Sequence, residues 1–332
     1  MGLNLEALFS STLIKMVELF AFIFIGYLLT KLGVVKAEAA GVLSKLENTL
    51  FIPACVMGTL MGSFTIPKIH ESWRLLVFSL AIAVVVIPLA LLAARLCSKD
   101  PYDRHVIAYG LSFSNFGYMG IAVVDSVFPE HMGNYMIFTL VLWILIYGWA
   151  VPAWLIPKTE KQSVGQRIKS LFNPMFVGAL LGIFLGLTGL HTMVPEGVER
   201  VFVSVVDTAG ACMSPIAMIL TGITVASIDL KRALKTWNIY VVTVLRLVVF
   251  PLLGFAAFLL LPKSIFSESF VKCAICSLAM PLGLGPVIIP AAYGKDTGKA
   301  AAMTLVSHLL SVITIPLIFI LAELFCSYKF TQ

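Results

Sequence analysis

The chain alternates between long apolar stretches and short polar connections. The apolar stretches are long enough to cross a hydrocarbon core of about 30 Å as helices, and they lack the roughly 10-residue alternation typical of membrane barrel strands. The class is therefore all-α. The pattern predicts ten membrane helices, over residues 7–30, 41–61, 73–95, 106–127, 135–156, 174–190, 201–224, 238–261, 270–292 and 300–324.

The composition supports a membrane protein. Of 332 residues, 60% are hydrophobic and 12% are charged, and the mean hydropathy is +1.00. A soluble core of this size could not bury so much apolar surface. Glu6, Lys15 and Glu18 interrupt the first apolar run, and no small-residue cleavage site follows. This run is therefore predicted to be a spanning helix and not a signal peptide.

The basic residues predict an orientation. A net charge of +6 would suit nucleic acid in a soluble protein, but in a membrane protein lysines and arginines first report topology. Most of them lie in the odd-numbered connections, for example Lys31, Arg104 and Lys235. The bias predicts a multi-pass protein of the cell (plasma) membrane, with odd connections in the cytoplasm and both termini outside. The expected surroundings are the lipid bilayer, and no nucleic-acid partner is expected.

The two halves of the chain resemble each other at an offset of about 160 to 165 residues. The matching positions are Ile23–Gly26 with Ile183–Gly186, Pro53 with Pro215, Pro88 with Pro251, Gly120 with Gly285, and Thr139–Val141 with Thr304–Val306. Five helices per half would make the second unit enter the membrane from the opposite side. The predicted organisation is a first five-helix repeat over 1–156, a cytoplasmic linker over 157–173 and an inverted second repeat over 174–332.

The fourth helix of each half is predicted to be broken at mid-membrane. Proline removes a backbone donor and glycine tolerates unwound backbone. Such residues occur at equivalent positions of both halves, namely Asn115, Gly117 and Gly120 in the first and Pro281, Gly283, Gly285 and Pro286 in the second. Small residues could instead serve tight helix packing. Their equivalent placement favours two broken helices that cross at a cavity.

The crossing predicts an anion site. The second half-helices would begin near Phe116 and Gly285, and helix N-termini favour negative charge such as a carboxylate. Asn115 would add an amide, although it could instead bridge helices, and Pro286 suits a first helical turn. The predicted substrate-binding residues are Asn115, Phe116, Gly117, Gly120, Pro281, Gly283, Gly285 and Pro286.

Ionisable residues within the spans are candidates for ion coupling. Glu47 and Asp207 align under the repeat, and Asp125 follows the first break. These three are the possible coupling residues, but interfacial placement is an equal alternative for Glu47 and Asp207. Three other groups have simpler expected roles: Glu18 pairs with Lys15, Arg246 braces the domain by binding a carboxylate or carbonyl, and His308 packs, although it could relay protons.

Signals for other functions are weak. Cys273 and Cys276 form a C-x-x-C inside a membrane run without a second pair or a nearby histidine, so the six cysteines are expected to be small buried hydrophobes. There is no Walker A motif, no Rossmann glycine fingerprint, no H-E-x-x-H and no nucleophile elbow. The sequence predicts no enzymatic activity, no metal site and no cofactor.

Several segments resemble one family. SNFGYMGIAVV (Ser114–Val124) is similar to the SN-x-G-[F/Y]-[L/M]-G-I-P segment of the auxin efflux carrier family, which includes plant PIN-type carriers and bacterial members linked to malate or malonate. The second, sixth, seventh and tenth predicted helices also resemble this family, in LENTLFIPACVMGTLM, NPMFVGALLGIFLGL, MSPIAMILTGITVA and LVSHLLSVITIPLIFIL. The resemblance covers nearly the whole chain.

The resemblance implies a ten-helix, five-plus-five inverted repeat in which helices four and nine cross. It also implies a scaffold of helices one, two, six and seven, and often a homodimer. Two features depart from the family. Ala122 stands where many members have proline, and the short central connection lacks the long regulatory loop of many plant members.

These observations together predict a secondary transporter. Its expected substrate is a small organic anion, a carboxylate such as malate, malonate or an auxin-like acid, moved by alternating access. One alternative is an ion-coupled symporter or antiporter of related fold, of the sodium/proton or bile-acid type. Another is a membrane receptor that binds a ligand without moving it.

Overall fold

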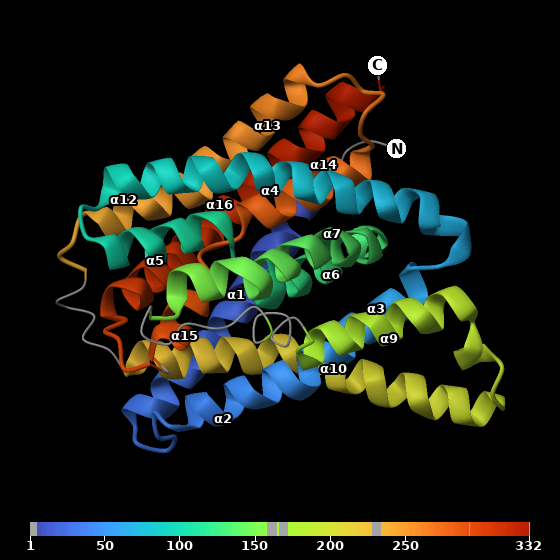
Figure 1. Cartoon of the computed structure of the whole chain (residues 1–332), viewed down its shortest axis with the longest axis horizontal. Helices are drawn as coiled ribbons and strands as arrows, with labels where there is room; N and C mark the ends of the chain where they lie inside the picture. The colour runs from blue at the N-terminus through green and yellow to red at the C-terminus, as the bar shows by residue number, and fades with distance from the viewer. Residues whose placement is uncertain (1–4, 158–164, 166–171, 228–233, 292, 332) are drawn as a thin grey trace.

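The computed structural model describes residues 5–157, 165, 172–227, 234–291 and 293–331, and in this part of the chain every regular element is a helix (Figure 1). The predicted all-α class is confirmed. Two shorter apolar helices cover Phe116–Val127 and Pro174–Thr188. Six described helices are long and apolar enough to cross a membrane, namely Leu5–Lys31, Glu71–Cys97, Pro129–Leu155, Glu196–Ala226, Asn238–Leu260 and Gly298–Phe330.

The elements follow one another with short connections. The first half contains α1 (Leu5–Lys31), α2 (Ala39–Leu46), η1 (Glu47–Phe51), α3 (Ile52–Ser63), η2 (Ile66–Lys68), α4 (Ile69–Cys97), α5 (Pro101–Ser112), η3 (Phe116–Gly120), α6 (Ile121–Val127), η4 (Pro129–His131), α7 (Met132–Leu145) and η5 (Ile146–Leu155). The second half contains α9 (Pro174–Thr188), η7 (Leu190–Thr192), α10 (Glu196–Ala226), α12 (Asn238–Val244), η8 (Leu245–Val249), α13 (Phe250–Leu260), α14 (Glu268–Ala279), α15 (Gly285–Ala291) and α16 (Gly298–Thr331).

Local sequence explains several helix ends. The Asp100 side chain accepts a hydrogen bond from the Asp103 backbone N–H at 2.8 Å and begins α5. Asn173 caps α9 in the same way, through the Phe176 N–H at 3.0 Å. In both helices a proline follows the cap, where its missing N–H costs nothing. Gly189 ends α9 in the left-handed region, with φ of 65°.

The observed helix limits differ by several residues from those predicted by hydropathy. α4 begins at Ile69 and not at 73, α10 begins at Glu196 and not at 201, and α16 continues to Thr331 and not to 324. The prediction stopped where charged residues begin, whereas helices continue past the hydrocarbon. The two glutamates in the first turn of α10 are favoured there by the helix dipole. α9 is shorter than predicted because Gly189 ends it.

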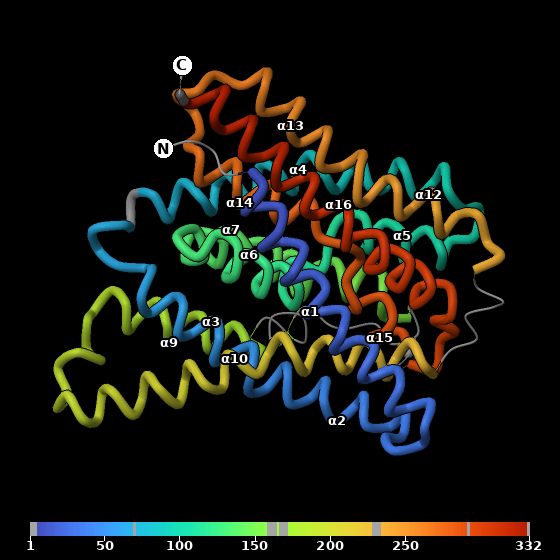
Figure 2. Tube along the Cα trace, turned by 180° about the vertical axis from the view of Figure 1, so that it is seen from behind, coloured from blue at the N-terminus to red at the C-terminus, as the bar shows by residue number. Residues whose placement is uncertain are grey.

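One side of the molecule is a close-packed group of helices, which we call the scaffold: α1, α2–α3, α9 and α10. α1 packs on α10, and α3 packs on both α9 and α10; α3, α9 and α10 lie together in the lower part of Figures 1 and 2. A Cβ atom at Gly178 or Gly182 would lie 2.6 Å from a backbone oxygen of α3. Backbones can approach this closely only through glycine.

The two broken helices meet at their breaks. α5 ends at Ser112 before an extended stretch, and α14 ends at Ala279 before the stretch that leads to α15. Ser114 and Leu282 form an isolated antiparallel bridge. The Asn115 N–H donates to the Pro281 carbonyl at 2.7 Å. The backbone groups released by each break are therefore satisfied partly by the other, and this satisfies the main requirement for unwound chain at membrane depth.

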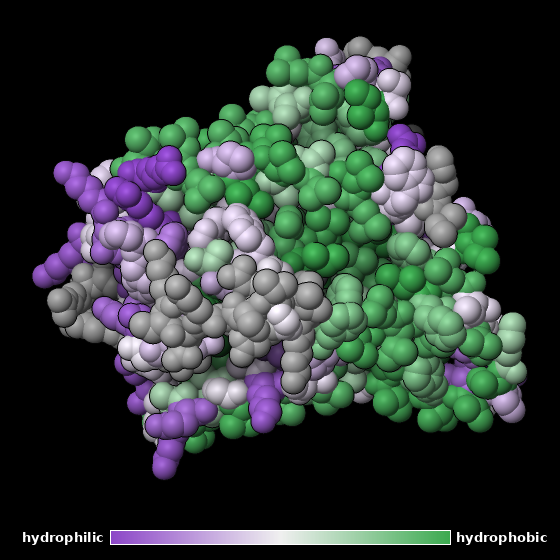
Figure 3. Space-filling model, viewed as in Figure 1, coloured by the Kyte–Doolittle hydropathy of each residue, from purple (hydrophilic) through white to green (hydrophobic). Residues whose placement is uncertain are grey.

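The surface separates apolar and polar regions. Figure 3 shows hydrophilic residues gathered mainly at the left end, where Figure 1 places the ends of α2, α5, α12 and α15, whereas apolar residues cover the middle. The described ends of the chain lie near each other in both ribbon views. An apolar belt with a polar end is the surface expected of a protein that crosses a bilayer several times.

Candidate functional site

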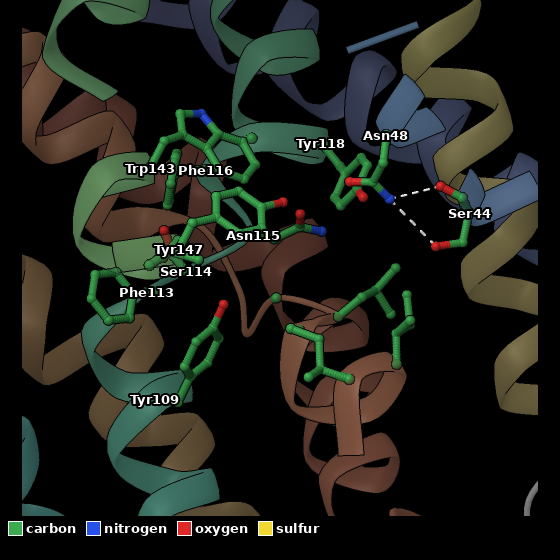
Figure 4. Close-up of a pocket in the computed structure, with 17 residues that line it drawn as sticks. Ser44, Asn48, Tyr109, Phe113, Ser114, Asn115, Phe116, Tyr118, Trp143 and Tyr147 are labelled. Carbon is green, nitrogen blue, oxygen red and sulfur yellow. Dashed lines mark hydrogen bonds between the residues drawn. The ribbon is translucent and has the colours of Figure 1, made fainter. Parts of the chain in front are cut away.

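A cavity of about 250 Å³ lies at the crossing of the broken helices, and we call it the crossing cavity (Figure 4). The extended residues Ser114 and Asn115 form part of its wall, and the first turn of η3 continues it. Gly283, Leu284 and the start of α15 line another part. Ser44 and Asn48 line the cavity from the scaffold. The cavity therefore lies between the broken helices and the scaffold.

The predicted substrate-binding residues divide into two groups. Asn115, Phe116, Gly117, Gly283 and Gly285 line the crossing cavity. The other three, Gly120, Pro281 and Pro286, are not part of its lining. Gly120 packs against the Tyr135 ring and hydroxyl, and Pro281 accepts the backbone hydrogen bond from Asn115. Pro286 occupies the first turn of α15.

Asn115 both lines the cavity and bridges two helices. Its Nδ2 lies 3.0 Å from Nε2 of His308 on α16, and both side chains are buried. The His308 Nδ1 lies 2.8 Å from the Thr304 carbonyl, to which it donates. The Nε2 atom is therefore the acceptor, and the amide of Asn115 donates to it. This contact holds the Asn115 side chain at the cavity wall.

The first turn of η3 supplies hydrogen-bond donors. A helix leaves its first N–H groups without intrahelical partners, and the helix dipole makes this end positive. η3 continues into α6, so the helix extends over Phe116–Val127. The start of α15 supplies fewer donors than predicted, since Pro286 has no N–H and the Val287 and Ile288 amides both bond to the Leu284 carbonyl.

Aromatic side chains form most of the remaining wall. Phe116 meets Trp143 edge to face at 5.0 Å between ring centroids, and Trp143 stacks on Tyr147 at 5.9 Å. The aromatic residues of the lining are Tyr109, Phe113, Phe116, Tyr118, Trp143 and Tyr147. None of the described lining residues carries a charge. Our sequence reasoning missed this wall because its members come from separate helices, and the i, i+4 spacing of Trp143 and Tyr147 was the available signal.

Arg246 holds the ends of both broken helices. Its Nε donates to the Met280 carbonyl at 3.0 Å, Nη1 to the Leu111 carbonyl at 2.8 Å and Nη2 to the Ser277 carbonyl at 2.9 Å. The side chain is 1% exposed. The C-terminal ends of α5 and α14 both carry the negative end of a helix dipole, which a cation offsets. The predicted bracing role of Arg246 agrees with these contacts.

A second cavity of about 500 Å³, which we call the outer cavity, lies on the other side of the crossing between α1, α3, α6 and α10. Its lining includes the ion pair of Lys15 with Glu18, 3.1 Å apart, which confirms that these neighbours pair with each other. Asp125 and Asp207 also line it and are exposed. Glu47, the third predicted coupling residue, lines neither cavity and is fully buried.

Apolar helices long enough to cross a bilayer, with a cavity at the crossing of two broken helices, define a multi-pass membrane transport protein. A family profile described as membrane transport protein matches residues 11–167 and 158–319. The chain belongs to this family, the auxin efflux carrier family. Comparison with curated proteins finds no significant match.

Proposed function

We propose that the protein is a secondary transporter that moves a small organic anion across the cell membrane by alternating access. The observation that carries this proposal is the crossing cavity, where Asn115 and the first turn of η3 face the same small space. Hydrogen-bond donors at the positive end of a helix suit a carboxylate. The cavity also lies where a moving unit would meet the scaffold.

The lining favours one kind of organic anion. The volume of about 250 Å³ is below the range of about 300–1,000 Å³ typical of pockets for drug-sized ligands. The first turn of η3 can hold one carboxylate, but the described lining offers no cation for a second. The aromatic wall suits a flat apolar body. We therefore favour a monocarboxylate with an apolar or aromatic body over a dicarboxylate such as malate or malonate.

The proposed topology has ten membrane crossings arranged as two inverted five-helix repeats, with the odd connections in the cytoplasm and both termini outside. The location of the polar end of the molecule supports this orientation, because α2, α5, α12 and α15 end there. The broken helices would move with their neighbours against the scaffold, exposing the site first to one side and then to the other. A homodimer built through the scaffold is the proposed assembly.

The test is flux into proteoliposomes. We expect saturable uptake of labelled phenylpyruvate, an aromatic monocarboxylate that stays ionised at neutral pH, and weaker uptake of malonate. Replacing Asn115 with alanine removes a hydrogen bond to a charged group, worth about 1.5–3 kcal/mol, so affinity should fall by about 10-fold or more. Unchanged flux and affinity in this variant would remove Asn115 from the site.

Two other results would favour the alternative functions. Saturable binding without any flux would indicate a receptor. Flux that depends on sodium alone would indicate a cation-coupled relative.

A further inference from the structure

Glu47 is a buried carboxyl group without a partner. It begins η1, and its side chain is 0% exposed. Neither carboxyl oxygen has a hydrogen-bond partner among the described residues. An ionised carboxylate cannot be held in such surroundings without a compensating cation or donor, so the group takes up a proton. Glu47 is therefore neutral in the conformation that the structure shows.

Glu47 lies at the layer of protein that separates the two cavities. The next residue along the helix, Asn48, lines the crossing cavity, and Cys55, two turns further on, lines the outer cavity. The carboxyl group lies close enough to the Tyr118 hydroxyl and the Cys55 thiol to act on both electrostatically. Figure 4 shows Tyr118 beside Asn48 at the cavity wall. A small movement of η3 past η1 would therefore expose Glu47 to one cavity or the other.

The backbone at Glu47 is also unusual. η1 is a π-helical turn inserted between α2 and α3, which have ordinary helical backbone on both sides. Such turns are rare and occur often at functional sites, because the extra residue turns a side chain away from its regular helix face.

The elements around η1 bring few charges to Glu47. α9 carries no titratable side chain, and Lys45 on α2 is exposed. The remaining titratable groups on the helices that pack against η1 are Cys55 on α3 and Glu196, Glu199, Arg200, Asp207 and Cys212 on α10, to which Tyr118 on η3 is added. Cys55 and Asp207 line the outer cavity.

We propose that Glu47 is the proton-binding site through which the transporter couples anion movement to proton movement, an inference that rests on the proposed transport function. Glu47 binds a proton from water on one side, is buried in the neutral form while the broken helices move, and releases the proton to water on the other side. The unprotonated form blocks this movement, because burial would leave its charge unpaired. A bound anion beside Asn48 and Tyr118 favours the neutral form by charge repulsion, so proton and anion travel in the same direction.

The experiment uses proteoliposomes loaded with a pH-sensitive dye, with phenylpyruvate as the probe. A pH gradient that is acidic outside should drive wild-type accumulation above the equilibrium level and acidify the interior as the anion enters. Glu47→Gln keeps the shape and neutrality of the protonated side chain but binds no proton. This variant should exchange internal for external phenylpyruvate within about twofold of wild type, and its pH-driven accumulation should fall to the level of protein-free vesicles. Glu38→Gln, which removes an exposed carboxyl just before α2, is the matched control and should behave as wild type.

The outcomes separate the two proposals. Absence of saturable exchange in the wild type would reject the proposed transport function. Wild-type exchange without accumulation driven by the pH gradient, or unchanged accumulation in Glu47→Gln, would reject the role of Glu47 alone. If Glu47→Gln does not fold, Glu47→Asp keeps the proton-binding group at a shorter reach and should shift the pH of half-maximal uptake. An unchanged midpoint would then overturn the proposal.

Discussion

Arg246 is predicted to hold the two broken helices together, and replacing it with methionine tests this. Methionine has a similar length and suits the buried site, but it cannot donate a hydrogen bond. The Ser277 carbonyl would keep the Ser114 hydroxyl, which donates to it at 2.7 Å. The Leu111 and Met280 carbonyls have no other donor among the described residues.

The expected loss follows from those two carbonyls. A buried polar group left without a partner costs about 1–3 kcal/mol, so two such groups cost about 2–6 kcal/mol. Removing the guanidinium also removes the cost of burying a charge, which offsets part of this loss. We therefore expect Arg246→Met to lower the free energy of unfolding by about 2 kcal/mol, at the lower end of that range. Arg246→Lys should be intermediate, because an ammonium group lacks the planar fork that reaches three carbonyls.

The assay is denaturant titration in detergent micelles, followed by tryptophan fluorescence. Arg200→Met is the matched control, since Arg200 pairs with Glu196 on the exposed part of α10 with 76% of its side chain accessible, where an ion pair contributes little. Equal unfolding midpoints for the two variants would refute the reasoning. They would show that the crossing is stable without its cation, through its backbone hydrogen bonds alone.

Three further predictions concern the site and the scaffold. A Cβ at Gly285 would lie 2.7 Å from the Tyr109 hydroxyl oxygen, so Gly285→Ala should reduce phenylpyruvate uptake, and adding Tyr109→Phe should restore part of it; no recovery would contradict a purely steric cause. His308→Leu leaves the Asn115 amide without its acceptor and should weaken anion binding, measured by thermal shift with added phenylpyruvate, whereas equal shifts would show that the pairing does not position Asn115. Gly182→Leu should lower stability by about 1–3 kcal/mol through overpacking against α3, and wild-type denaturation would argue against direct backbone packing there.

The positions of the helix breaks could be predicted from sequence because their cause is local. Asn115, Gly117, Pro281 and Gly283 are poor residues for the interior of an apolar helix, and their effect on the backbone needs no tertiary contact. The structure places both breaks where these residues occur. Helix ends were less accurate, because hydropathy reports where the apolar surface ends and not where the backbone stops being helical.

The site was only partly predictable. Asn115 could be selected as a polar residue at a break, but its partner His308 is 193 residues away in the chain. The aromatic wall likewise depends on which faces of separate helices meet. No periodicity within one helix identifies a side chain on another, so Trp143 and Tyr147 resembled ordinary packing residues.

The sequence by itself determined the all-helical membrane class, the two breaks and the family resemblance, since these depend on composition, on backbone preferences and on the order of short motifs. Tertiary structure decided which polar residues have partners. It gave Arg246 three carbonyls to bind, placed Asp125 and Asp207 at an open cavity and left Glu47 buried without a partner. The physical reason is that burial and hydrogen bonding depend on atoms contributed by helices distant in sequence, which no local pattern of residues specifies.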